Sequence, residues 1–103
     1  MTIETTEEIL IDEKITLKKD LPSKYNVIFL NDDQTPMDFV TELLILLFKH
    51  TKETAEKIML TVHEEGKAVV GTYTFEIAEQ KTTEAIMIAR KEGFPLSIQM
   101  EVV

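Results

Sequence analysis

The sequence contains no cysteine and only three glycines and three prolines among 103 residues. Without cysteine, neither a disulfide framework nor a thiolate zinc site can form, and a reducing compartment is allowed. Basic residues are also in short supply, because 11 lysines and arginines stand against 19 acids, a formal net charge of −8. Nucleic acids and anionic membranes bind surfaces with clustered Lys and Arg. The charge therefore argues against both as partners and favours a basic protein surface.

Long apolar runs are absent as well. No stretch approaches the ~18 residues that a membrane span needs, and the first residues lack the basic and apolar regions of a signal peptide. A cytoplasmic protein is therefore expected. The length and the 44% hydrophobic content fit one small globular domain.

Residues 1–23 differ from the rest. They carry six acids and three lysines, and their apolar residues follow neither the helical nor the strand period. Too few apolar side chains line up on one face to offset the entropy of ordering. We expect a flexible acidic extension at 1–23 before a folded core at 24–103; a short strand or helix docked on the core is the alternative.

Strand and helix patterns alternate through the core. Tyr25–Leu30 is apolar at almost every position, which is typical of a strand in the middle of a sheet. Thr35 is the expected N-cap of the first helix, with Pro36 as its first residue. The expected elements are a strand over 25–30, a helix from 36 to near 50, a helix from 51 to a C-cap at 66, a strand over 68–73, a helix capped at 74 and ending near 92, and a strand over 96–102.

This order predicts an α+β domain in which a small sheet has its helices on one side. Apolar residues cover so much of the first helix that it is expected to be largely buried, with at most one edge facing a groove. The patterning leaves the strand directions open.

One polar cluster has members that can converge. Asn31, Asp32 and Asp33 follow the first strand directly, and His63 lies in the last turn of the second helix. The simplest interpretation is a solvated turn and a helix-end histidine. An enzyme would use an Asp as acid or metal ligand and His63 as base, but no zinc-protease motif, nucleophile motif or glycine-rich phosphate loop is present.

A recognition pocket is the third interpretation. A primary ammonium group has three N–H donors, and an amide oxygen, a carboxylate and a neutral imidazole nitrogen can accept them. Apolar residues of both helices would lie beside these acceptors: Met37, Val40, Met59 and Val62. An amine next to an apolar pocket describes the start of a polypeptide chain, although core packing is the alternative for each apolar residue.

At these positions the chain resembles the ClpS family, adaptors that present N-degron substrates to the bacterial Clp ATPase–protease. The resemblance extends from about Lys24 to Val102. It is carried by Asn31-Asp32-Asp33-x-Thr35-Pro36-Met37-x-Phe39-Val40, by Met59-x-x-Val62-His63-x-x-Gly66-Lys67-Ala68, and by Pro95-Leu96. Gln34 departs from the family, which often has an aromatic residue there. This difference is expected to alter contacts with the second substrate residue and to leave the amine site unchanged.

The resemblance implies a non-enzymatic adaptor with no cofactor and no metal. Its fold would be similar to the C-terminal domain of the ribosomal stalk protein, and it would be a monomer when free. Its substrates would be peptides and proteins that begin with Leu, Phe, Tyr or Trp, and Met37 would act as a gatekeeper against Ile and Val.

By the same resemblance, Asn31, His63 and one of Asp32 and Asp33 would hold the α-amino group. The side-chain pocket would be formed by Thr35, Pro36, Met37, Val40, Met59, Val62 and Leu96. The N-terminal domain of the Clp AAA+ ATPase would dock at Glu76, Glu79 and Lys81, and the unfoldase would engage the N-terminal extension. A different peptide-binding module on the same scaffold remains the alternative.

Overall fold

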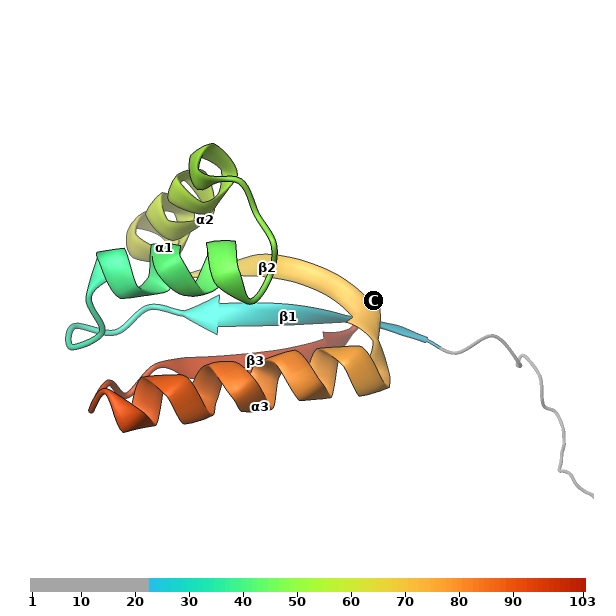
Figure 1. Cartoon of the computed structure of the whole chain (residues 1–103). Helices are drawn as coiled ribbons and strands as arrows, with labels where there is room; N and C mark the ends of the chain where they lie inside the picture. The colour runs from blue at the N-terminus through green and yellow to red at the C-terminus, as the bar shows by residue number, and fades with distance from the viewer. Residues whose placement is uncertain (1–22) are drawn as a thin grey trace, which may run out of the picture.

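The computed structural model describes residues 23–103, so the expected extension falls almost wholly outside the described residues. This part of the chain contains three helices and a three-stranded antiparallel sheet, arranged as Figure 1 shows. The elements are β1 (Lys24–Leu30), α1 (Met37–Leu46), α2 (Lys52–Glu65), β2 (Lys67–Thr74), α3 (Phe75–Lys91) and β3 (Ser97–Val102). The α+β class and the order of elements are as predicted.

The first strand is the centre of the sheet, as its apolar sequence predicted. The strand order is β2-β1-β3, and both neighbours pair with β1 in antiparallel directions. Val27 and Phe29 are fully buried in the core. Ile28 points to the opposite face, because side chains alternate along a strand, and its cross-strand partners there are Val69 and Gln99.

The three helices share one hydrophobic core with the sheet. Figure 1 shows α3 running along β3, while α1 and α2 lie together beside β2. Small residues of α3 let this helix approach the sheet closely, since Ala78, Ala85 and Ala89 are all 0% exposed. Leu44 of α1 and Val62 of α2 join the same core cluster. This packing fixes the ends of β1 and α2 relative to each other.

The start of α1 differs from the prediction. Pro36, not Thr35, is the N-cap, and its side chain makes no cap hydrogen bond. Thr35 lies one residue before the cap, and its hydroxyl donates to Asp32 Oδ2 at 2.7 Å. Thr35 is therefore part of the loop that Asp32 holds, and the helix begins one residue later than expected.

The end and burial of α1 also differ. The helix ends at Leu46 rather than near His50, because Lys49 adopts a left-handed conformation with φ 63° and the chain then turns. His50 contacts the carbonyl oxygen of Val70 through Nε2 at 2.6 Å, which ties the turn to β2. The helix is not largely buried, since Leu46 is 68% exposed.

The ends of α2 follow the prediction. Thr51 accepts a hydrogen bond from the Thr54 amide, and Gly66 is a left-handed C-cap with φ 91°. Thr74 is the N-cap of α3, without a side-chain hydrogen bond. Gly71 lies at an irregularity, because Val27 pairs with Gly71 and Ile28 with Val69, which leaves Val70 as an extra residue of β2.

Candidate functional site

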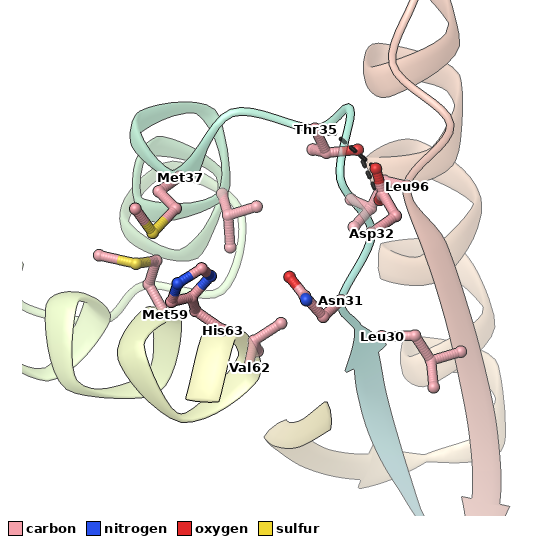
Figure 2. A pocket seen from close by; sticks show the side chains of 10 residues that line it. Leu30, Asn31, Asp32, Thr35, Met37, Met59, Val62, His63 and Leu96 are labelled. Atoms are coloured by element: carbon pink, nitrogen blue, oxygen red, sulfur yellow. Dashed lines mark hydrogen bonds between the residues drawn. The ribbon is translucent and has the colours of Figure 1, made fainter. Parts of the chain in front are cut away.

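The candidate site lies where the end of β1 meets the end of α2. The backbone N–H of Asn31 donates to the carbonyl oxygen of Gly66 at 2.9 Å, which joins the two chain segments directly. His63 is three residues before Gly66, one turn back along α2. Figure 2 shows the Asn31 amide and the His63 ring pointing toward each other across the site. The two residues that the sequence singled out from distant segments are therefore neighbours.

Asp32 organises the loop that follows β1. Its carboxylate accepts from the backbone N–H groups of Gln34 and Thr35, both at 2.8 Å, as well as from the Thr35 hydroxyl. Desolvation raises the pKa of this carboxyl, but these hydrogen bonds and the nearby charge of Arg90 outweigh it and hold the pKa below its ordinary value of 3.8. Asp32 is thus an ionised side chain that stabilises the loop through its hydrogen bonds.

Arg90 supports the opposite wall of the site. Its Nη1 donates to the carbonyl oxygens of Phe94 and Leu96, each at 2.9 Å, and its positive charge stabilises the Asp32 carboxylate. Arg90 could not be selected from the sequence, because a basic residue in the last turn of a helix is ordinary. Its role depends on the fold of the 94–96 segment back over α3.

A narrow cavity lies between these walls, between α1, α2 and the loop before β3. Its volume is about 10 Å³, room for about one water. The lining residues are Leu30, Asn31, Asp32, Thr35, Met37, Val40, Met59, Val62, His63 and Leu96. The structure therefore brings together all the residues expected at the side-chain pocket except Pro36, and it adds Leu30. Alternation of polar and apolar residues would have shown which face Leu30 occupies, but Tyr25–Leu30 is apolar at almost every position.

An outer opening continues from the cavity. It has a volume of about 300 Å³ and is lined by Asn31, Asp32, Asp33, Thr35, Pro36, Met37 and His63. Asn31, Asp33 and His63 are all exposed. Pro36 thus borders the mouth rather than the interior, and the polar groups gather at the mouth while the interior is mainly apolar.

The residues expected to dock the ATPase lie on α3. Glu76 and Glu79 are exposed. Lys81 is half-buried, because its ammonium group donates to the carbonyl oxygen of Leu47 at 2.8 Å and lies 5.9 Å and 5.5 Å from the ring centres of Phe48 and Tyr73. Lys81 therefore links α3 to the end of α1.

Within residues 23–103, no three His, Cys, Asp or Glu side chains are grouped as a metal site would require. None of the helices in this part of the chain has the length and apolar character needed to cross a membrane.

The chain is similar to known proteins in sequence and in structure. The family described as "ATP-dependent Clp protease adaptor protein ClpS" matches residues 20–99. The adapter proteins ClpS of three Vibrio cholerae serotype O1 strains are each 46% identical over 94 residues, which are 91% of this chain and 87% of theirs. The solved structure of Agrobacterium tumefaciens ClpS2 bound to L-phenylalaninamide has a TM-score of 0.78 and 40% identity, covering 81% of this chain and 100% of that one.

Proposed function

Because the chain belongs to the ClpS family of adaptor proteins of the ATP-dependent Clp protease, we propose that it binds proteins by a bulky first residue. Leu, Phe, Tyr and Trp are the residues that it would accept, together with the free α-amino group, before delivery to the Clp AAA+ unfoldase. One observation carries the proposal: the polar opening at Asn31, Asp33 and His63 leads directly into an apolar cavity. The solved relative holds an amino-acid amide with a free amine and a phenyl side chain.

The α-amino group would be held at the mouth by Asn31, His63 and Asp33. Of the two candidate carboxylates, Asp33 is the one we assign to the amine, because both oxygens of Asp32 already accept hydrogen bonds within the loop. Asp33 borders the opening and is exposed. An amide oxygen, a carboxylate and an imidazole nitrogen match the three N–H donors of an ammonium group. Asp32 would then act indirectly, by holding the loop.

The first side chain would enter the cavity past Met37. At about 10 Å³ the cavity does not admit a Leu or Phe side chain in this conformation. Met37 is 44% exposed and sits opposite Met59 at the entrance, so both unbranched thioethers can turn aside. A gate of this kind favours a side chain that is slim at its β-carbon, which is why Met37 would discriminate against Ile and Val. Val40, Val62 and Leu96, which are all buried, would form the rigid wall behind it.

The expected contributions to the binding free energy support a reversible complex. Burial of a Leu or Phe side chain contributes roughly 1.5–3 kcal/mol, and each hydrogen bond to a charged amine about 1.5–3 kcal/mol. Association entropy opposes these gains. A micromolar Kd, about −8 kcal/mol, is the expected outcome.

A titration with matched peptides tests the proposal. We expect a fluorescent peptide beginning with Phe to bind, and its N-acetylated form to bind at least about tenfold more weakly, because acetylation removes the charge and two donors while the acceptors stay. A third peptide that begins with Ile serves as the specificity control. Equal affinity for the free and acetylated peptides would refute amine recognition and favour a different peptide-binding module on this scaffold.

Delivery would involve a second surface at the start of α3. We place the ATPase N-terminal domain at Glu76 and Glu79, which are exposed, with Lys81 beside them. Because Lys81 also donates a hydrogen bond to the end of α1, its replacement would affect both ATPase docking and the stability of the fold. The proposal assigns the chain no catalytic step, and it places the interaction in the cytoplasm, where an ATP-dependent protease has its nucleotide.

A further inference from the structure

A second hollow adjoins the amine site but lies outside it. The α1–α2 groove, of about 600 Å³, is lined by Met37, Asp38, Thr41, Glu42, Ile45, Lys52, Glu56, Met59 and Leu60. Met37 and Met59 belong to both this groove and the cavity described above. The groove is therefore continuous with the entrance through which the first side chain would pass.

The groove has the length of a short extended peptide. Its α1 residues recur at four-residue steps, from Met37 through Thr41 to Ile45, so they form one face of the helix. Eight residues of helix span about 12 Å. An extended chain advances about 3.3 Å per residue, so roughly three to four residues fit between the entrance and Ile45.

The chemistry of the groove is amphipathic and acidic. Met37 and Leu60 are 44% and 46% exposed, so apolar area remains available to a ligand. Three carboxylates, those of Asp38, Glu42 and Glu56, also line the groove, against one base, Lys52. Leu60 lies outside the hydrophobic core, so its exposed area contributes nothing to core packing. The surface is complementary to a segment that combines basic and apolar side chains.

We infer that the α1–α2 groove binds the substrate residues that follow the first two, with a preference for segments in which Lys or Arg alternates with apolar residues. The inference rests on the proposed function, because the α-amino site fixes where this segment begins. It adds a second determinant to substrate selection: proteins with the same first residue would be ranked by the charge and hydrophobicity of the next few positions.

Three probes separate the two sites. The first is the dipeptide amide Phe-Ala; the second continues Phe-Ala with four alternating Lys and Leu residues; the third continues it with four Ser residues. At low salt we expect the Lys/Leu peptide to bind about three- to tenfold more tightly than the Ser peptide, as expected for two exposed ion pairs. Salt should reduce this difference.

Matched variants locate the effect. Glu42→Gln with Glu56→Gln should abolish most of the Lys/Leu preference and leave the dipeptide affinity within about twofold, since neither residue touches the amine cavity. Glu84→Gln with Glu101→Gln makes the same charge change at two exposed positions outside the groove and should leave the preference intact. Leu60→Gln should weaken the Lys/Leu peptide without affecting the dipeptide.

The outcomes are distinguishable. If all three probes fail to bind, the proposed function fails and the inference falls with it. If the dipeptide binds but the Lys/Leu and Ser peptides have equal affinities, only the inference is overturned. It is also overturned if both double variants reduce the preference equally, which would indicate overall charge, or if light scattering shows a dimer that the groove variant dissociates, which would assign the groove to a second copy.

Discussion

At the scale of single residues, neighbours with the same side chain have different surroundings. Asp32 and Asp33 are both carboxylates at the end of β1, yet Asp32 braces the loop through three hydrogen bonds, whereas Asp33 borders the opening. Arg90 reinforces the difference, because its charge lies near Asp32 while its N–H groups hold the segment before β3. These different surroundings are the basis for the proposal that Asp32 stabilises the loop and Asp33 contacts the substrate amine.

Asp33→Ala should weaken binding of a Phe-initiated peptide by about tenfold or more, because a charged hydrogen bond to the amine is lost. The free energy of unfolding should change by less than about 0.5 kcal/mol, as for an exposed site. Peptide titration and urea unfolding measure the two quantities. An unchanged peptide affinity would remove Asp33 from the amine site.

The variant Asp32→Asn tests whether the Asp32 carboxylate stabilises the fold, through the pH dependence of the free energy of unfolding. The pKa of Asp32 is lower in the folded chain than its ordinary value of 3.8, so the unfolded state binds more protons in the window below that value. The ionised carboxylate therefore contributes stability that is present above pH 3.8 and is lost as the pH falls through the folded-state pKa. We expect the variant to be less stable than the parent at about pH 7 and the gap to narrow below about pH 4. Urea unfolding across this range measures it; a gap independent of pH would contradict the assignment.

At the scale of elements, the ends of the helices hold the site together. The carbonyl of Gly66, at the end of α2, receives the Asn31 amide, and Lys81 of α3 donates to Leu47 at the end of α1. Both contacts satisfy backbone oxygens that a helix leaves without an internal partner. A helix terminus in this protein is thus both a stop signal and an attachment point for another segment.

Gly66→Ala should lower the free energy of unfolding by about 1 kcal/mol, because the left-handed conformation at φ 91° is unfavourable for a residue with a Cβ. A Cβ at Gly66 would meet nothing within 4 Å, so the effect would come from the backbone alone. Glu65→Ala, one residue earlier and exposed, is the matched control and should change stability by less than about 0.5 kcal/mol. Equal effects in urea unfolding would show that the left-handed cap is not the cause.

At the scale of the whole molecule, residues 23–103 contain the sheet, the helices, the core and the candidate pocket. The core lies on one face of the sheet and includes residues from all three helices. The proposed division, an extension at 1–23 and an adaptor core at 24–103, remains a prediction that truncation can test.

Removal of residues 1–22 should leave the unfolding midpoint and the affinity for a Phe-initiated peptide unchanged, since the contacts that form the core and pocket lie within 23–103. Degradation of a Phe-initiated fluorescent protein by the Clp protease should fall strongly, if the unfoldase engages this segment. The full chain is the control in both assays. A truncated chain that binds the peptide weakly would instead make the segment part of the recognition surface.

The sequence by itself determined the order of the elements, both ends of α2 and most of the pocket residues. These features follow from local chemistry: the period of apolar residues, a Thr before a helix, a Gly after one, and motifs that carry the family resemblance. Pro36 was expected inside the pocket but borders its mouth, and Thr35 was expected to cap α1 but is bound by Asp32. Local rules rank the partners that a residue can have; they do not decide which partner it takes.

Only the tertiary structure decided the strand directions, the separate surroundings of Asp32 and Asp33, and the contacts of Lys81 and Arg90. Each depends on segments that are distant in sequence, such as Lys81 reaching Leu47, 34 residues away. The α1–α2 groove belongs to this class too, since it exists only because two helices pack at a spacing that leaves Met37 and Leu60 partly exposed. Periodicity identifies which face of a helix is apolar, but packing alone decides how much of that face remains open to a ligand.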